Sequence, residues 1–264
     1  MELTGRTALV IGAGSGVGRG VALALDRAGL SVIVADLDPV TAQQTGDLLS
    51  ERAQVVQVDA TSQASLATLA SRIPVLHLLV VTVGGIDVRP LDELTEAHWQ
   101  WAWNLNVMTS VLAVQTFLPA LRQQRGSGIV LTGSGSGLNL PDPDPNAALY
   151  ATTKHALTGY TGVLRAALAS EGIQVTLLVP SGVEGNLAAT SARSRTAAFG
   201  EALDEARGQQ PPGRRLLPAP AIGEALVRGL QENRTFVNNR GADFHAAMVE
   251  WLDEWQRNTV TVST

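Results

Sequence analysis

The residue pair that most plainly suggests chemistry is Tyr150 and Lys154, in the stretch LYATTKHALTGY. Residues four apart lie on the same face of a helix, so the phenol and the ammonium would be neighbours. Tyrosine ordinarily titrates at about pH 10 and is a poor base near neutrality, but a nearby positive charge favours its phenolate. The pair suggests proton transfer; the alternative is an aromatic and a solvated charge that merely share a helix face.

A glycine-rich loop near the start of the chain suggests a nucleotide site. The apolar run TALVIG (7–12) has buried-strand length, and the residues after the glycines have helical spacing. A second apolar run, SVIVAD, ends at Asp36 and completes a strand–helix–strand unit of about 30 residues. Gly12, Gly16 and Gly18 would allow a tight turn, close approach of the backbone to a pyrophosphate, and close helix packing. The anion would rest on the helix N-terminus.

Strands and helices keep alternating after this unit. Apolar strands are expected at AQVVQVD, VLHLLVVTVGG, GSGIVLTGS and IQVTLLVPSGV, and helices at TSQASLATLASRI, at HWQWAWNLNVMTSVLAVQTFLPAL and from Tyr150 onward. Alternation of this kind predicts an α/β fold with a doubly wound parallel sheet covered on both faces. No repeat, linker or composition break divides residues 1–264, so a single domain is expected.

Composition restricts the function further. The 264 residues carry a net charge of −5 with no basic cluster, which argues against nucleic acid as a partner. With no cysteine there is neither a disulfide nor a thiolate nucleophile, and no metal site is predicted. The N-terminus lacks a signal-peptide pattern, and no apolar run approaches the roughly 20 residues that span a membrane. A soluble, cytoplasmic protein is expected.

Taken together, these motifs resemble the short-chain dehydrogenase/reductase family. The resemblance covers about residues 3 to 237, and in the glycine loop Ile11 stands where the family has threonine. Further matches are the S-x-x-G that begins at Ser134 and the Y-x-x-x-K that begins at Tyr150. A second glycine register through Gly14, typical of medium-chain dehydrogenases and methyltransferases, is disfavoured by these later motifs.

The resemblance implies an NAD-dependent oxidoreductase that interconverts a secondary alcohol and a ketone. Tyr150 would be the general acid/base, and Lys154 would lower its pKa and bond the nicotinamide ribose. Ser134 would hold the substrate oxygen, and Asn106 would position a water that links Lys154 to solvent. The cofactor-binding set, which also includes Tyr150 and Lys154, is predicted to be Gly12, Ser15, Gly16, Val17, Gly18, Asp36, Asp59, Ala60, Gly84, Pro180 and Val183.

The carboxylate at the end of the second strand bears on the choice of cofactor. Asp36 would accept hydrogen bonds from a ribose 2′-hydroxyl and repel a 2′-phosphate, which favours NAD over NADP. Arg19 lies in the glycine loop but is judged insufficient to overcome that repulsion. Asp59, followed by Thr61, matches the adenine-contacting D-x-T of the family, with a helix cap as a nearly equal alternative.

Several positions depart from the family pattern. Thr82 and Val83 replace two asparagines after the fourth strand, so hydrogen bonds between the central strands would be replaced or lost. Gly185 stands where a threonine would contact the cofactor, although the backbone of Val183 could still hold the nicotinamide carboxamide. The loop 141–146, rich in proline and aspartate, is expected to be solvated at the mouth of the site.

Substrate identity is not encoded in any motif. Residues 183–220 resemble the mobile substrate lid of the family, with a short helix expected at AAFGEALDEA. A solvated lid is the favoured explanation of its arginines, with contact to an anionic substrate as the alternative; they are Arg193, Arg195, Arg207, Arg214 and Arg215. A small alcohol or ketone of moderate size and apolar character is the expected substrate.

The sequence also predicts self-association and leaves a non-enzymatic function open as an alternative. Two helices are apolar around much of their circumference, which predicts a homodimer or homotetramer; their apolar residues include Leu112, Val114, Phe117, Leu157 and Val163. The C-terminal stripe of Phe244, Met248, Trp251, Leu252 and Trp255 is a possible second contact. The rival hypothesis is a non-catalytic member of the fold that binds NAD as a regulatory or scaffolding ligand.

Overall fold

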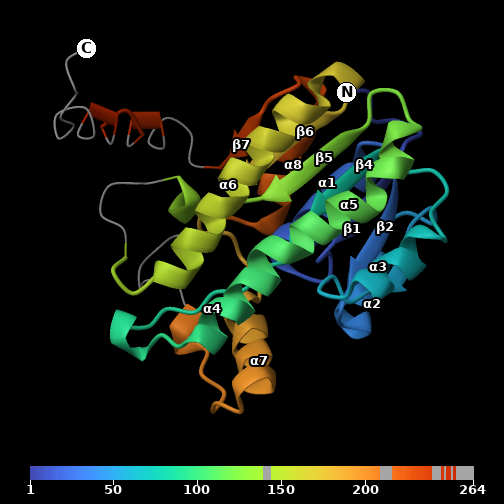
Figure 1. The fold of residues 1–264 in the computed structure, drawn as a ribbon. Helices are drawn as coiled ribbons and strands as arrows, with labels where there is room; N and C mark the ends of the chain where they lie inside the picture. Colours follow the sequence, from blue (N-terminus) through green and yellow to red (C-terminus); the bar gives the residue numbers. More distant parts are fainter. Residues whose placement is uncertain (139–143, 209–215, 240–244, 247, 251, 254–264) are drawn as a thin grey trace.

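The computed structural model describes residues 1–138, 144–208, 216–239, 245–246, 248–250 and 252–253. Within them a parallel sheet has the strand order β3-β2-β1-β4-β5-β6-β7 (Figure 1). The strands are β1 (Thr7–Ile11), β2 (Ser31–Asp36), β3 (Gln54–Gln57), β4 (Leu78–Val81), β5 (Gly128–Thr132), β6 (Gln174–Val179) and β7 (Phe236–Asn238). Because the order reverses between β1 and β4, the sheet is doubly wound, and the predicted fold class is confirmed.

The central strand β1 shows why the strands read as continuous apolar runs. Its successive side chains point to opposite faces of the sheet, and both faces are covered. Val10 belongs to the core formed with α1 (Gly16–Arg27) and α8 (Ala219–Gln231). Leu9 belongs to the core formed with α3 (Gln63–Ala70), α5 (Thr109–Arg122) and α6 (Ala148–Leu168). Because both faces are buried, apolar and polar residues do not alternate along the strand.

The long helix expected from His98 is interrupted. It consists of α4 (Glu96–Trp103), a π-helical turn (Asn104–Met108) and α5. A π turn inserts one residue into the helix and is frequent at functional sites, and this one contains Asn106. The apolar spacing alone could not reveal it, because a one-residue insertion leaves both halves amphipathic.

The lid region also differs from the expectation. The helix within it is α7 (Leu187–Phe199), which lies before most of the predicted stretch AAFGEALDEA and ends at Gly200, with φ +68°. Glycine adopts this left-handed conformation readily, so it stops the helix there. The two ends of the lid meet, since Val183 forms a parallel bridge with Leu217. Helix α8 and strand β7 were not predicted.

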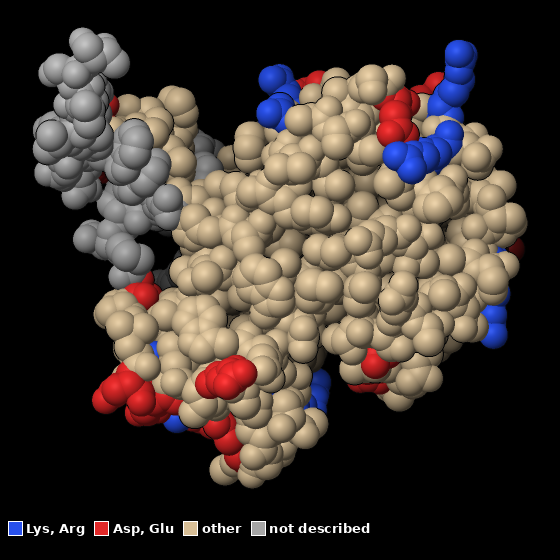
Figure 2. Space-filling view, in the orientation of Figure 1, with Lys and Arg blue, Asp and Glu red and all other residues tan. Residues whose placement is uncertain are grey.

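The helix stretch Glu96–Arg122 is long and apolar enough, by length and composition, to cross a membrane, although no such run was expected. Its α5 part packs against β4 and β5 and buries Phe117 and Leu121, so it is a core helix of the domain. The face that carries α5 and α6 shows few charged side chains, and these gather toward its edges (Figure 2).

Candidate active site

The glycine loop joins β1 to α1 beside the reversal in strand order. Gly12 has φ +87° and Gly16 has φ +50°, conformations that residues with side chains rarely adopt. A Cβ at Gly18 would lie 2.0 Å from the carbonyl oxygen of Gly12, so only glycine lets α1 begin this close to the loop. Ser15, Gly16 and Val17 line a cavity here with the first N–H groups of α1, which lack partners within the helix. The arrangement fits a pyrophosphate.

Thr82 replaces one of the hydrogen-bonding asparagines that the sequence lacks. Its hydroxyl lies 2.9 Å from the carbonyl oxygen of Ile11 and 3.0 Å from that of Gly12. The side chain therefore ties the end of β4 to the end of β1. A link between the central strands is kept, with a hydroxyl in place of an amide.

Asp36 shapes the loop as well as the cavity. Its Oδ2 accepts a hydrogen bond of 2.7 Å from the backbone N–H of Gly14, and its carboxylate lines the cavity. Arg19 donates to the carbonyl oxygen of Gly14 at 2.6 Å and to the hydroxyl of Thr45 at 2.9 Å. The guanidinium of Arg19 is thus engaged within the loop, while the carboxylate of Asp36 borders the cavity.

The remaining predicted cofactor residues gather on the same cavity. Asp59 accepts from the backbone N–H and the hydroxyl of Thr61, at 2.9 and 2.6 Å. The helix cap considered for Asp59 is instead supplied by Ser62, whose side chain accepts from the N–H of Ser65 at the start of α3. The other residues of this set that line the cavity are Ala60, Gly84, Pro180 and Val183.

Ser134, Tyr150 and Lys154 converge on one wall of the cavity. The Nζ of Lys154 donates to the carbonyl oxygen of Thr132 at 2.9 Å and lies 5.6 Å from the centroid of the Tyr150 ring. Ser134 lies close enough to Tyr150 to lower the pKa of its phenol. A Cβ at Gly137 would lie 2.6 Å from the backbone of Lys154, so this glycine lets the turn after Ser134 pack directly on α6.

Burial dominates the electrostatics of this group. It raises the pKa of Tyr150, and Ser134 opposes the rise only in part. Burial also lowers the pKa of Lys154 to about 8. The predicted depression of the Tyr150 pKa, which included the charge of an oxidised nicotinamide, does not arise from the side chains alone. The physical reason is that both groups are desolvated, which disfavours each charged form.

Asn106 does not line the cavity. Its Oδ1 accepts from the N–H of Gly85 at 2.7 Å, and its Nδ2 donates to the carbonyl of Gly85 and the hydroxyl of Thr153, both at 3.0 Å. A Cβ at Gly84 would come within 3.0 Å of the Asn106 Oδ1 and 3.3 Å of the Lys154 Nζ. Asn106 therefore lies behind Gly84 and ties the loop after β4 to α6.

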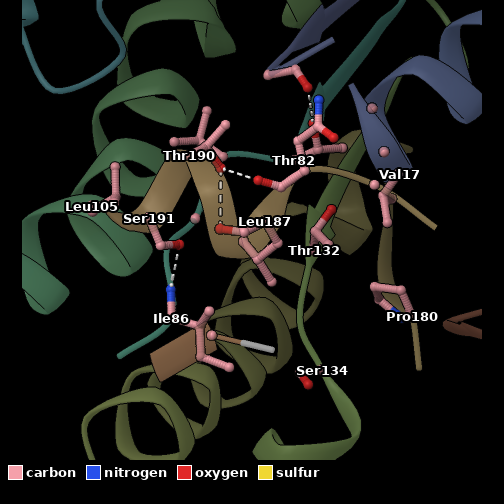
Figure 3. A pocket seen from close by; sticks show the side chains of 18 of the residues that line it. Val17, Thr82, Ile86, Leu105, Thr132, Ser134, Pro180, Leu187, Thr190 and Ser191 are labelled. Carbon is pink, nitrogen blue, oxygen red and sulfur yellow. Dashed lines mark hydrogen bonds between the residues drawn. The ribbon is translucent and has the colours of Figure 1, made fainter. Parts of the chain in front are cut away.

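The cavity measures about 1720 Å³. Figure 3 shows Val17 and Pro180 on one side of it and Leu105 and Ser191 on the other. Several lining residues were not predicted, because small, apolar and hydroxyl side chains belong to no recognisable motif; they include Ile86, Val88, Leu105, Thr132, Leu187, Ala188, Thr190, Ser191, Ser194, Ala197 and Leu216. The hydroxyl of Thr132 is buried with no hydrogen-bond partner among the described residues.

Helix α7 forms one wall of the cavity, and hydrogen bonds of Ser191 and Ser194 help to hold it in place. The hydroxyl of Ser191 accepts from the backbone N–H of Ile86 at 3.0 Å (Figure 3). The indole N–H of Trp101 donates to the hydroxyl of Ser194 at 2.9 Å. The aromatic ring of Phe199, at the end of α7, packs edge-on against the ring of His98.

A buried ionic cluster that the sequence did not reveal fixes the same wall. Asp87 is 1% exposed and pairs with Arg89 at 2.7 Å and with Arg195 of α7 at 3.7 Å. Glu201 pairs with Arg89 and with His98, each at 3.1 Å. Its hydrogen bond with Arg89 is the main cause that lowers the pKa of Glu201 to about 2. The cluster clamps the lid to the loop after β4 and to α4.

Some predictions fall on residues that are not described. The loop 141–146 is described only from Asp144, which lines the cavity and accepts from the N–H of Asn146 at 2.9 Å. Arg214 and Arg215 lie outside the described residues, as do three members of the C-terminal stripe, Phe244, Trp251 and Trp255. Leu252 of that stripe is 51% exposed.

Comparison with known proteins agrees with this geometry. The chain is 31% identical over 195 residues to the short chain dehydrogenase/reductase astE of Aspergillus oryzae, covering 70% of this chain and 74% of the relative. It is 27% identical over 190 residues to the 7alpha-hydroxysteroid dehydrogenase of Escherichia coli, covering 69% and 73%. The solved structure of a short chain dehydrogenase/reductase from Burkholderia phymatum in complex with NAD matches with a TM-score of 0.86, 27% identity and full coverage of both chains.

The family model for short chain dehydrogenases matches residues 6–196. That range includes the glycine loop and all of Ser134, Tyr150 and Lys154. The chain belongs to the short-chain dehydrogenase/reductase family, a family of oxidoreductases with a nucleotide-binding Rossmann fold.

Proposed function

We propose that the protein is an NAD-dependent oxidoreductase that interconverts a secondary alcohol and a ketone. One observation carries the proposal: Ser134, Tyr150 and Lys154 meet on one wall of a cavity that also contains the glycine loop and Asp36. A dinucleotide fits these residues, because the glycine positions leave room for backbone approach and the carboxylate is held in place by the Gly14 N–H. When bound, the nicotinamide supplies the hydride donor or acceptor.

The chain's own residues then handle the proton. Burial keeps Tyr150 protonated near neutral pH, which suits donation of its proton to the oxygen of a ketone. Ser134 supports the same oxygen through its hydroxyl. The ammonium of Lys154, held by the Thr132 carbonyl, stabilises the phenolate that remains on Tyr150. Asn106 acts indirectly by fixing the loop behind Lys154.

The choice of cofactor is proposed from the position of Asp36. Its carboxylate borders the cavity, whereas Arg19 is held by the Gly14 carbonyl and Thr45. A ribose with free hydroxyls would find an acceptor in Asp36, and a 2′-phosphate would meet a fixed negative charge. We therefore propose NAD(H) as the preferred cofactor. The NAD complex of the Burkholderia phymatum protein supports this choice.

The substrate is proposed to be moderately large and largely apolar. The small and apolar side chains that line the cavity include Ile86, Val88, Leu105, Ala151, Leu187 and Leu216. The hydroxyls of Ser191 and Ser194 are already engaged with Ile86 and Trp101. Such a lining favours a substrate whose reactive oxygen is its main polar group.

We also propose a cytoplasmic homo-oligomer in which the lid, residues 183–220, covers the substrate. Val114, Phe117 and Leu157, which were expected to need a partner, are buried within the chain itself. Val163 of α6 is 68% exposed and has small residues around it in the sequence, and α6 lies on the weakly charged face that Figure 2 shows. That face is the proposed contact with a second subunit.

The test is a screen of secondary alcohols with NAD and of ketones with NADH, in which absorbance of the reduced cofactor is followed. Tyr150→Phe is expected to lose at least about 100-fold in turnover with the best substrate, the usual worth of a positioned acid or base. NADH binding should persist in this variant, measured by fluorescence titration. Near-normal turnover would remove Tyr150 from the mechanism, and NADH binding without any turnover in the screen would favour the non-catalytic alternative.

A further inference from the structure

The charges that line the cavity are unevenly distributed. Its described lining includes five carboxylates, those of Asp36, Asp38, Asp59, Asp144 and Glu184. Against them stand one lysine, Lys154, and one arginine, Arg193. Lys154 is buried and donates to the Thr132 carbonyl on the catalytic wall. An anion at the glycine loop therefore has Arg193 as the arginine that borders the same space.

The other described arginines of the lid are committed elsewhere. Arg195 is 2% exposed and binds Asp87 and the carbonyl oxygen of Ile86. Arg207 pairs with Glu93 and Asp204. Arg193 is exposed and has no hydrogen bond or ion pair with any residue that the structure describes. Its guanidinium is available to a ligand.

The anchoring of α7 determines where Arg193 points. Residues two apart on a helix point to nearly opposite sides, because each residue turns by about 100°. Since Arg195 is held in the buried cluster, Arg193 is directed to the other side of α7. Thr190 and Ala197, which share that side at spacings of three and four, also line the cavity.

The beginning of α7 lies against the glycine loop. A Cβ at Gly185 would be only 2.7 Å from the Cα of Gly16, so the backbone two residues before α7 touches the loop. Arg193 follows Leu187 by six residues, about 9 Å along the helix axis, and helical side chains lean toward the N-terminus. Figure 2 shows the surface hollowed between the part with α7 and the part with α2 (Pro39–Gly46) and α3.

We propose that Arg193 binds the pyrophosphate of the dinucleotide from the lid side. This rests on the proposed function, because it assumes a dinucleotide on the glycine loop. The N-terminus of α1 offers a partial positive charge of roughly half a unit, which leaves most of the charge of two phosphates unmatched. Gly185 contributes no side-chain donor. A guanidinium supplies both a full charge and several donors, and it links cofactor binding to the position of α7.

The experiment measures dissociation constants in place of turnover. NADH, ADP-ribose and adenosine are titrated into the wild type, Arg193→Gln and Arg228→Gln; Arg228 is an exposed arginine of α8 that does not line the cavity. Arg193→Gln is expected to weaken NADH and ADP-ribose by a similar factor of about 10 or more, because a charged hydrogen bond is lost. Adenosine, which has no phosphate, should bind as before, and Arg228→Gln should match the wild type. Arg193→Lys should recover part of the loss.

Four results would count against the inference. Unchanged NADH binding in Arg193→Gln, with normal binding in the wild type, would refute it while leaving the proposed function intact. Equal weakening of adenosine would indicate damage to the fold of the site. Unchanged NADH binding together with a raised KM for a keto acid, but not for its ester, would assign Arg193 to an anionic substrate. A wild type that binds neither NADH nor ADP-ribose would refute the proposed function itself.

Discussion

At the scale of single residues, hydrogen bonds within the protein hold the polar side chains of the site in position. Asp36 holds the Gly14 N–H, and Lys154 holds the Thr132 carbonyl, so both are positioned before any ligand arrives. Pre-positioned groups lose little freedom on binding, which is the main advantage of an ordered site. Two predictions separate the charge of each group from this structural role.

The first concerns Asp36. Asp36→Asn removes the negative charge and keeps one oxygen that can accept from the Gly14 N–H, although the 3.1 Å bond that the other oxygen accepts from the Asp38 N–H is lost. We expect the preference for NAD over NADP in kcat/KM to shrink by about 10-fold or more, because repulsion of the 2′-phosphate is removed. Asp36→Ala, which loses both functions, should in addition weaken NADH itself. A wild type that prefers NADP would contradict the prediction.

The second concerns Lys154, whose pKa burial lowers to about 8 from 10.5. Between these values the unfolded chain binds more protons at this residue than the folded chain does, so the free energy of unfolding should rise with pH. The raised pKa of Tyr150 acts in the opposite direction above about pH 10, which limits the window to about pH 8 to 10.

Lys154→Met isolates this effect. From about pH 8 to about pH 9.5, the unfolding free energy of the wild type should rise by about 1 to 2 kcal/mol more than that of the variant. Urea denaturation at the two pH values measures the difference. Parallel pH dependence in the two proteins would show that Lys154 is not desolvated as described.

At the scale of elements, the described part of the predicted lid, residues 183–208 and 216–220, packs against the rest of the domain. Its ends are joined by the bridge from Val183 to Leu217, and its helix α7 is pinned by Ser191, Ser194 and Arg195. Buried ion pairs seldom add net stability compared with apolar packing, but they fix one arrangement, because breaking one leaves an unmatched buried charge. We infer that the cluster sets the position of α7 over the cavity.

The variant Glu201→Gln tests whether the ionic cluster holds α7 in position. Loss of its charge should loosen the end of α7, raise the KM for substrate several-fold and speed hydrogen exchange within α7, with a smaller effect on kcat. The control is Glu232→Gln, which breaks an exposed pair with Arg234 outside the cavity lining and should change none of these values. If exchange in α7 were unaltered by Glu201→Gln, the cluster would not be what holds the helix.

At the scale of the whole molecule, one face is conspicuously poor in charge. It covers α5 and α6, and both helices already bury their inner sides against the sheet (Figures 1 and 2). Exposed Trp99 and Trp103 lie on α4, next to the same pair of helices. A second copy of the chain with the same face would cover it under two-fold symmetry.

The prediction is a homodimer or homotetramer at micromolar concentration, measured by light scattering coupled to gel filtration. Val163→Glu would place a charge in the proposed contact and should shift the protein toward a monomer of 27.7 kDa. Arg165→Glu alters the charge of the same helix, and its oligomeric state is compared with that of Val163→Glu. A monomeric wild type would refute the assembly, and an oligomer indifferent to Val163→Glu would move the interface elsewhere.

Patterns along the chain predicted the fold class, which is confirmed, and the candidate catalytic residues, which stay a prediction. Both depend on short-range patterns: apolar strands followed by glycine at the turn, and Tyr150 and Lys154 one helical turn apart. Such patterns involve residues that are close in sequence, so they can be recognised without the structure. The presence of the glycine loop, Ser134 and α6 at one cavity follows from the parallel order of the strands.

Other features could not be predicted from the sequence, because they depend on contacts between segments that are far apart in the chain. Asp87 and Arg195 are more than a hundred residues apart, and the sequence around each of them contains no motif that predicts their ion pair. The π turn at Asn106 could not be predicted from the sequence either. The same holds for the hydrogen bond from the Thr82 hydroxyl to the Ile11 carbonyl, which replaces that of a missing amide. Burial likewise sets the pKa of Tyr150 and Lys154, since desolvation comes from the surrounding fold and not from the sequence spacing.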